Sequence, residues 1–248
     1  MANYVNLKNP PVAIALFQLK YTGDIKLSDF LTYENSIKHN LPIRREKIEV
    51  GIDLGKTSIH LGETKIEGTT NAEIKSYVFI STDQKTKLEV SIDTITFTEE
   101  HQYIGWENFS KDFFSLLDKI RPILERVQIK RTSVRFINRF TLQNFENPQK
   151  YFNTMVTSKN PQSLYPIHQY GFRLVMDVPD TEIYSIVNHN VETISNGQYS
   201  YTFDIDVLDK QNLVYDIGTL SLNLEKLREI KNKIFFESIT QETIDLCN

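Results

Sequence analysis

The chain has 248 residues, of which 40% are hydrophobic and 24% charged, values typical of a globular protein with a sizeable buried core. Its 28 basic and 32 acidic side chains give a formal net charge of −4, which argues against a protein that binds nucleic acid by overall charge, although a local basic patch stays possible. A single cysteine, Cys247, excludes a disulfide framework within the chain, and we expect a free thiol near a loose terminus.

The first predicted elements are a strand and a short helix. The apolar run from Val12 to Leu19 follows two prolines, is too short to cross a membrane and lacks the basic start of a secretory signal, so we expect a buried central strand in a cytoplasmic protein. Ser28 or Asp29 can cap a helix over residues 30–38. Four strand-like runs separated by turns follow, at 47–53, 57–66, 73–82 and 87–97.

A longer helix is predicted from Trp106, where the spacing of apolar residues changes from two to three or four. Pro122 lacks a backbone donor, so we expect it to kink or end this helix. The apolar residues that share the predicted buried face are Trp106, Phe109, Phe113, Leu116, Leu117 and Ile120.

The second half of the chain repeats this order of elements. Its predicted elements are a strand at 132–142, a short helix at 147–156, strands near 170–177, 182–190, 198–208 and 213–219, and a helix over 223–237 with Leu224, Leu227, Ile230 and Ile234 on one face. The repetition predicts an α+β fold of two similar lobes, residues 1–128 and 129–248, which arose by internal duplication and share an interface. In each lobe we expect an antiparallel sheet with helices packed on one face.

A strip of basic residues is the most unusual feature of the sequence. Its members in the segment KRTSVRFINRF are Lys130, Arg131, Arg135 and Arg139. Because side chains alternate along a strand, the three arginines share one face. Asn138 lies on the opposite, apolar face, where we expect its amide to hydrogen-bond to a backbone edge, since an unpaired buried amide is costly.

Two interpretations of this strip stay open. Carboxylates on other strands, Glu89 and Asp93 in one half and Asp204 and Asp206 in the other, alternate in the same way and can neutralise the arginines in cross-strand ion pairs. Otherwise the guanidinium groups point into solvent and engage an anionic partner, either nucleic acid or an acidic protein surface. The surroundings of the three arginines decide between these interpretations.

Signals for catalysis are weak across the sequence. The five histidines show no metal-ligand spacing, and there is no glycine-rich phosphate loop or nucleophile elbow, so we expect no metal and no cofactor. Asp204 and Asp206, with Glu89 or Asp93, are the candidate catalytic residues if the protein is a metal-assisted phosphodiesterase or nuclease. Adjacent acids on an exposed strand face are also common without any catalytic role.

Four segments of the sequence resemble an uncharacterised, sporadically distributed bacterial protein family of similar length. They are NPPVAIALFQLKY near the start, YIGWENFSKDFFSLL at 103–117, VQIKRTSVRFINRF at 127–140 and IFFESIT at 234–240. The family's arginine–aromatic–x–asparagine–arginine segment matches residues 135–139 of this chain, and the resemblance brings no catalytic residue with it. The sporadic distribution is compatible with mobile elements or defence loci.

The sequence therefore predicts a non-catalytic binding or assembly protein that engages an anionic partner through its arginine strip. The loop 157–169, with two prolines, is the best candidate for a mobile binding loop, and Tyr165 and His168 are its candidate contacts. The alternatives are the nuclease described above and a small-molecule binder whose ligand lies between the lobes. The oligomeric state stays open.

Overall fold

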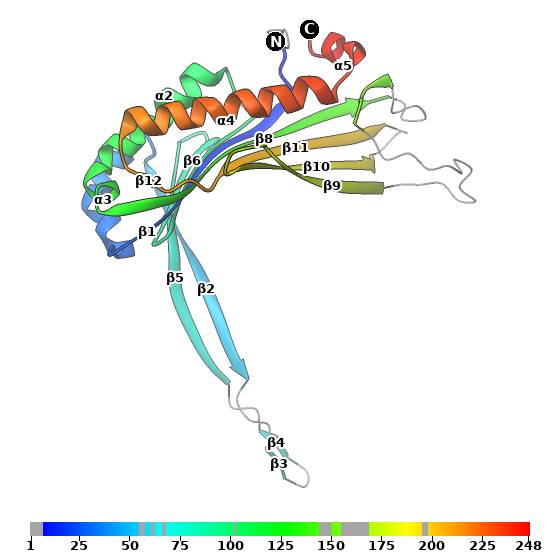
Figure 1. The fold of residues 1–248 in the computed structure, drawn as a ribbon. Coiled ribbons are helices and arrows are strands. Elements are labelled where there is room, and N and C mark those ends of the chain that lie inside the picture. Colours follow the sequence, from blue (N-terminus) through cyan, green and yellow to red (C-terminus); the bar gives the residue numbers. More distant parts are fainter. Residues whose placement is uncertain are drawn as a thin grey trace.

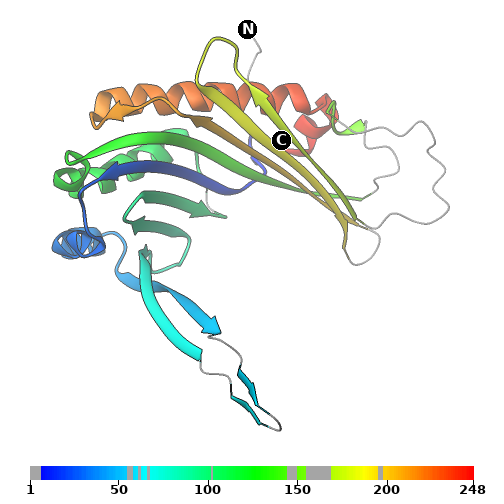
Figure 2. The ribbon, with the colours of Figure 1, turned by 60° about the horizontal axis from the view of Figure 1, so that its bottom comes forward.

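The computed structural model describes residues 7–54, 58–60, 63–65, 68–101, 103–143, 150–154, 169–194 and 198–248, with the backbone alone for those between 51 and 71. These residues form a mixed α+β fold with one large antiparallel sheet, which confirms the expected fold class (Figure 1). The long helices lie on one face of the sheet, and no described helix covers the other face, which we call the helix-free face (Figures 1 and 2).

The elements follow each other in an order close to the predicted one. The strands are β1 (Val12–Gly23), β2 (Ile43–Leu54), β3 (Ser58–His60), β4 (Glu63–Lys65), β5 (Gly68–Ile80), β6 (Thr86–Ser91), β7 (Thr94–Glu100), β8 (Val127–Leu142), β9 (Gln169–Asp177), β10 (Ile183–Thr193), β11 (Tyr199–Asp209) and β12 (Leu213–Val214). The helices are the 3₁₀ helix η1 (Leu27–Tyr33) and α1 (Glu34–Lys38), α2 (Trp106–Lys119), α3 (Arg121–Leu124), α4 (Ile217–Ser238) and α5 (Gln241–Leu246). Among the described helices, none combines the length and the apolar character that a membrane crossing requires.

The sheet is continuous across the predicted boundary between the two halves of the chain. Its strand order is β2-β5-β6-β7-β1-β8-β11-β10-β9, with β12 paired to β8. The first strand of each half, β1 and β8, form the central antiparallel pair, in a register that joins Val12 to Asn138 at one end and Gly23 to Val127 at the other. Both halves therefore contribute to one sheet, and the internal duplication stays a prediction.

A two-stranded arm extends from one end of the sheet. Strands β2 and β5 pair from Ile43 with Ile80 to Leu54 with Gly68, well past the ends of their neighbours. In both ribbon views the arm projects away from the helices, on the side of the helix-free face (Figures 1 and 2).

The core forms where α2 packs on the central strands. The ring centroid of Phe17 in β1 lies 4.4 Å from that of Phe109 and 4.8 Å from that of Phe113, both in α2. All six apolar residues predicted for this helix face are buried, so the predicted face is confirmed. The helix ends at Lys119, and Pro122 lies in the first turn of α3, as expected for a residue without a backbone donor.

Several sequence predictions need correction. The run 57–66 is two short strands, β3 and β4, which pair with each other in a separate two-stranded sheet. The run 87–97 is two strands, β6 and β7, because the chain turns between Ser91 and Thr94. The predicted strand at 213–219 stops at Val214, and α4 begins at Ile217. The Asp216 carboxylate caps this helix by accepting from the Thr219 backbone N–H at 2.7 Å. Of the predicted helix at 147–156, the structure describes residues 150–154, which form no α-helix; Phe152 instead makes an isolated antiparallel bridge with Ile239.

The buried face of α4 also differs from the predicted one. Ile230 and Ile234 are only half-buried. The buried side chains of this helix are Leu220, Leu224, Leu227, Lys231, Phe235 and Ser238. A lysine therefore occupies a core position between two turns of apolar residues.

Cys247 is a free thiol, as expected, but it does not lie near a loose terminus. It is buried, and its backbone carbonyl accepts from the Asn9 N–H at 2.8 Å, which joins the C-terminal turn to the segment before β1. Burial raises the pKa of the thiol.

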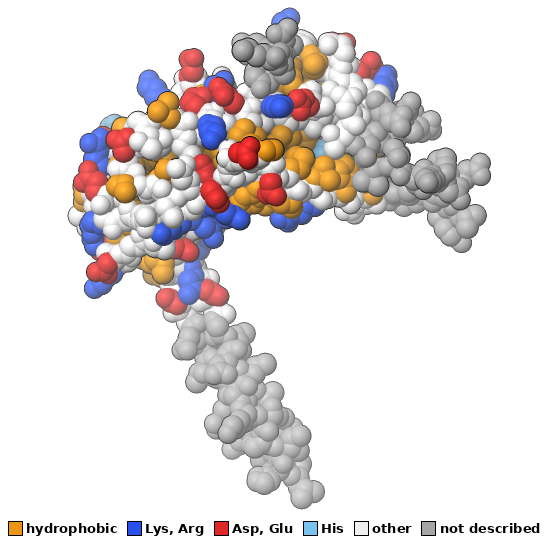
Figure 3. Space-filling model, in the orientation of Figure 1, with side chains coloured by type: hydrophobic (Ala, Val, Ile, Leu, Met, Phe, Trp, Pro, Cys, Tyr) orange, Lys and Arg blue, Asp and Glu red, His pale blue; other side chains and the backbone are white. Residues whose placement is uncertain are grey.

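Basic and acidic side chains are interspersed over the body of the molecule in the view of Figure 3. Several of them form exposed ion pairs, such as Lys150 with Glu242 at 2.8 Å. Pairs of this kind contribute about 0–1 kcal/mol each to stability, so they do not hold the fold together.

Candidate functional site

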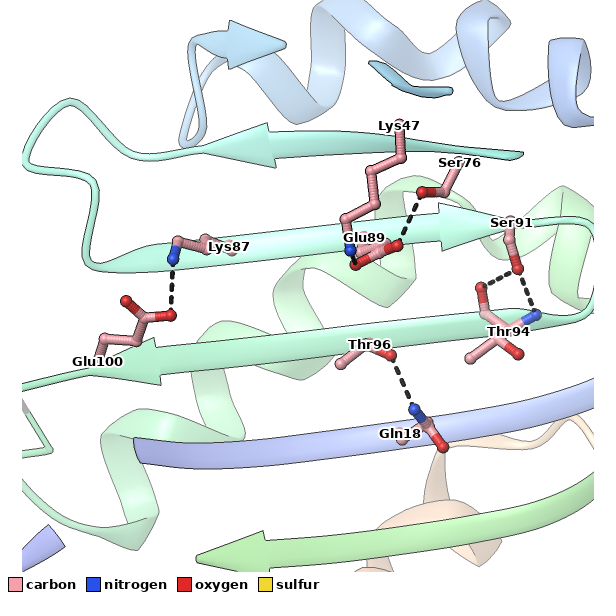
Figure 4. Close-up of polar contacts among 9 residues, drawn as sticks. All are labelled: Gln18, Lys47, Ser76, Lys87, Glu89, Ser91, Thr94, Thr96 and Glu100. Atoms are coloured by element: carbon pink, nitrogen blue, oxygen red, sulfur yellow. Dashed lines mark hydrogen bonds and ion pairs between the residues drawn. The ribbon is translucent and has the colours of Figure 1, made fainter. Parts of the chain in front are cut away.

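The helix-free face carries a ladder of polar pairs on its first-half strands. Figure 4 views these strands with the helices behind them and shows Lys47 with Glu89, Gln18 with Thr96, and Lys87 with Glu100. The Lys47 Nζ lies 2.5 Å from a Glu89 oxygen, and the other Glu89 oxygen accepts from the Ser76 hydroxyl at 2.7 Å. Neither Glu89 nor Glu100 is therefore free to pair with the arginines of β8.

Arg135 is neutralised by an acid on the neighbouring strand. Its Nε and one terminal nitrogen donate to the two oxygens of Asp204, each at 2.8 Å. The Asp204 side chain is only 8% exposed and also accepts from the Asn188 amide at 3.0 Å. The hydrogen bonds with Asp204 raise the pKa of Arg135 above its ordinary value. At this position the ion-pair interpretation is confirmed.

Arg131 and Arg139 have different surroundings. Within the described part of the chain, neither forms an ion pair with a carboxylate. Arg131 is half-buried, donates to the Gln18 side-chain oxygen and has a buried Nε without a hydrogen-bond partner. Arg139 is exposed. Lys130, next to Arg131 in the chain, donates to Gln128 at 2.5 Å. The hypothesis that this strip engages an anionic partner stays a prediction, and it now depends on Arg139.

The candidate catalytic carboxylates are not brought together. Asp206 accepts from the Ser133 hydroxyl at 2.5 Å, and burial raises its pKa. Glu89 lies on β6, separated from β11 by β7, β1 and β8, so four strand spacings of about 4.8 Å lie between them. Asp93, in the turn after β6, lies beside β1, where its backbone carbonyl accepts from the Tyr21 N–H at 2.9 Å, so β8 still separates it from β11. Within the described ranges, no three His, Cys, Asp or Glu side chains are placed to hold a metal ion.

The candidate loop residues Tyr165 and His168 lie outside the described residues. Asn138 behaves as predicted: it is 3% exposed, and its amide donates to the Phe203 backbone carbonyl at 3.0 Å. Because Asn138 points to the helix side of the sheet, away from the arginines, it belongs to a different site.

That site is a cavity of about 550 Å³ beneath α4, which we call the Lys231 cavity. First-half residues line it from the segments 7–12 and 103–106, and second-half residues line it from β8 and α4. In Figure 1, α4 crosses the central strands near the start of β1, where these segments meet. The cavity thus lies at the junction of the two halves.

Among the lysine and arginine side chains that are described at this cavity, only that of Lys231 is buried. It is 9% exposed, and its Nζ lies 3.9 Å from the ring centroid of Phe136 in β8. Among the described residues, no carboxylate pairs with it. Burial, together with repulsion from Arg228, lowers its pKa to about 7, so the ammonium and the neutral amine are both populated near neutral pH.

Arg228 lies one turn before Lys231 on the same side of α4. Its guanidinium is 5.1 Å from the Trp106 ring centroid and pairs with Glu225 at 3.1 Å. The Trp106 indole N–H donates to the same Glu225. These contacts hold Trp106 and Arg228 at the wall of the cavity.

Aromatic side chains form a large part of the wall, next to apolar residues of the segments 7–12 and 103–106. The Tyr103 ring packs edge-on against Phe136, with centroids 5.1 Å apart, and burial raises the pKa of Tyr103 to about 12, so it stays a neutral hydroxyl. Phe235 and Phe236 line the cavity from α4. Such a wall suits a flat ligand with a small polar or charged part.

Sequence reasoning missed Lys231 and Arg228, although a signal was present. Lys231 follows the buried Leu227 by four residues and precedes the buried Phe235 by four, which is the spacing of one helix face. A lysine at a core position of an amphipathic helix is rare, because its ammonium must leave water. Placing the buried face at Ile230 and Ile234 concealed this signal.

Fold and cavity together define an α+β protein with one antiparallel sheet, helices on one face and a basic, aromatic-walled cavity at the junction of its halves. No protein-family model matches the chain, and no curated protein sequence is similar to it. The family resemblance stays an expectation.

Proposed function

We propose that the protein binds a small anionic molecule in the Lys231 cavity. The observation that carries this proposal is a buried ammonium group that lines the cavity without an acidic partner among the described residues. An unpaired charge in the interior costs several kcal/mol, so proteins normally pair it or expose it. An anion in the cavity supplies the missing partner.

The shape and chemistry of the cavity agree with this proposal. A volume of about 550 Å³ is within the usual range for small-molecule sites. Its wall combines aromatic rings with polar groups that include Asn138, Arg228 and Lys231, as small-molecule sites commonly do. The favoured ligand has a flat apolar body and one anionic group.

The position of the cavity fits a ligand site between two duplicated lobes. In each half, the first strand is central, the following strands return to pair with it (β7 with β1, β11 with β8), and a long helix then packs on the sheet. The same order of elements in both halves supports the proposed duplication. A ligand at the junction contacts both halves and stabilises their association.

The proposal is tested by thermal denaturation with benzoate, indole-3-acetate or phenyl phosphate at millimolar concentration, each compared with a neutral analogue such as benzamide. We expect at least one anion to raise the Tm of the wild-type chain and its neutral analogue to have little effect. Lys231→Met should remove this shift, whereas Lys226→Met, at an exposed position of the same helix, should keep it.

Binding should also depend on pH. Because the pKa of Lys231 is about 7 in the free protein, affinity for the anion should fall as the pH rises from 7 to 9, when Lys231 loses its charge. Anions that give no shift, or a shift that Lys231→Met preserves, would contradict the proposal.

A further inference from the structure

We infer that Lys231 forms a reversible imine with a small carbonyl compound that carries an anionic group, an aromatic aldehyde acid or an oxo acid. This inference rests on the proposed function, since the imine ligand occupies the same cavity. It goes further because it makes Lys231 a covalent attachment site and gives Lys231 and Arg228 separate roles.

The first argument is the placement of the amine. The Lys231 Nζ lies at a cavity wall, 3.9 Å from the Phe136 ring centroid. The ring face stabilises the protonated form by a cation–π contact. When Lys231 loses its proton, the ring does not occupy the nitrogen lone pair, which stays free to react. Desolvation beside another cation is also an arrangement that activates lysine amines as nucleophiles. The burial of Lys231 and its repulsion from Arg228 supply both conditions.

The second argument is that Arg228 and Lys231 can bind different parts of one ligand. The Arg228 guanidinium carries more N–H donors than its ion pair with Glu225 uses, so it can also hold an anionic group while Lys231 reacts as the neutral amine. The two residues are three apart on α4, a spacing that makes them neighbours on the helix surface. A ligand that presents its anionic group to Arg228 can therefore bring a carbonyl carbon within reach of Lys231.

The reaction is a balanced condensation. The Nζ lone pair attacks the carbonyl carbon and forms a carbinolamine, and the carbonyl oxygen then leaves as water with the two hydrogens of the amine. A C=N double bond replaces the C=O bond, so no oxidant or reductant is required. Hydrolysis reverses the reaction, which makes the attachment a dynamic one.

The side chains around Lys231 favour the imine once it has formed. The titratable groups that line the cavity with it are Lys8, Tyr103 and Arg228, whereas β8 contributes the uncharged Phe136 and Asn138. Tyr103 stays neutral, and the nearby Glu225 carboxylate is paired with Arg228 and accepts from Trp106. Among the described residues, no carboxylate therefore pairs with Lys231 to hold it as the ammonium.

The experiment uses 4-carboxybenzaldehyde with the full wild-type chain near pH 7.5, followed by borohydride reduction and peptide mass mapping. We expect a saturable carboxybenzyl adduct at Lys231, formed at least about tenfold faster than at the exposed Lys226 and Lys233, because most of an ordinary lysine is protonated at this pH. Benzaldehyde, which lacks the anionic group, should react at Lys231 more slowly. Arg228→Gln should remove this preference for the carboxylated aldehyde.

The possible outcomes separate the two proposals. If benzoate binds in the Lys231 cavity but borohydride fixes no adduct at Lys231, or fixes one no faster than at Lys226, the imine is wrong and the anion site stands. If benzoate also fails to bind, both proposals fall. Because the mapping uses the wild-type chain, the result does not depend on whether a variant folds.

Discussion

Lys231 is buried and Arg135 partly exposed, but only Arg135 has an acid beside it. Arg135 makes two hydrogen bonds to Asp204, each at 2.8 Å, which offset the cost of removing both charges from solvent. Lys231 has an aromatic ring at 3.9 Å and a second cation one turn away. The arginine pair therefore stabilises the sheet, whereas the lysine lowers the stability of the empty protein.

The cost of Lys231 should appear as a pH dependence of stability. Its pKa is about 7 in the folded chain and 10.5 ordinarily, so between these values the unfolded chain binds more protons. The free energy of unfolding of the wild type should therefore rise with pH relative to Lys231→Met, by about 2 kcal/mol between pH 7 and 9. Below pH 7 the two proteins should change in parallel.

Urea denaturation at pH 6, 7, 8 and 9 measures this difference. Glu99, whose pKa burial raises to about 7, titrates in both proteins and cancels in the comparison. The matched control is Lys226→Met, whose exposed lysine should give no pH-dependent difference. A constant gap between wild type and Lys231→Met from pH 7 to 9 would show that Lys231 keeps an ordinary pKa.

At the scale of the element, β8 contains both an ion-paired and an exposed arginine within five residues. Arg135→Ala leaves the nearly buried Asp204 carboxylate with Asn188 as its remaining side-chain partner, so we expect a loss of about 1–3 kcal/mol, less than for a fully buried pair because Arg135 is partly exposed. Arg139→Ala should change stability by no more than about 0.5 kcal/mol. Chemical denaturation of both variants checks this contrast.

The same pair of variants addresses the binding hypothesis that the sequence suggested. If the strip engages an anionic partner, loss of capture should follow Arg139, while loss of stability follows Arg135. Equal destabilisation by both substitutions would mean that Arg139 has a structural partner as well.

Helix α4 shows how one element serves two purposes. Leu220, Leu224 and Leu227 pack on the sheet, and the Phe235 ring stacks with Phe203, with centroids 5.9 Å apart. Between these contacts the same face presents Lys231 to the cavity. Apolar contacts on both sides of Lys231 fix the helix firmly enough to keep a lysine buried.

The whole molecule should unfold as one unit, although the sequence suggests two lobes. The pairing of β1 with β8 makes one sheet from both halves, and Phe136 of the second half packs against Phe109 of the first, with centroids 6.1 Å apart. We therefore expect a single thermal transition in which the calorimetric enthalpy equals the van't Hoff enthalpy. Two separate transitions, or a stably folded fragment 1–128, would contradict this expectation.

Alternation and helical periodicity predicted much of this architecture. The α2 face, the antiparallel strands and the separation of Asn138 from the arginines follow from local geometry, because a strand or a helix places residues on faces whatever surrounds it. Turns were harder: β6 and β7 looked like one run because a tight turn leaves little trace in composition.

The sequence by itself determined that the chain is α+β, that three arginines share one strand face and that Asn138 points the other way. Only the tertiary structure decided which arginine meets an acid, because strand order, and not spacing along the chain, places Asp204 beside Arg135 and Glu89 several strands away. It also decided that Lys231 is buried beside Phe136. The burial of Lys231 depends on contacts between segments that are far apart in the sequence, and no local sequence pattern predicts those contacts.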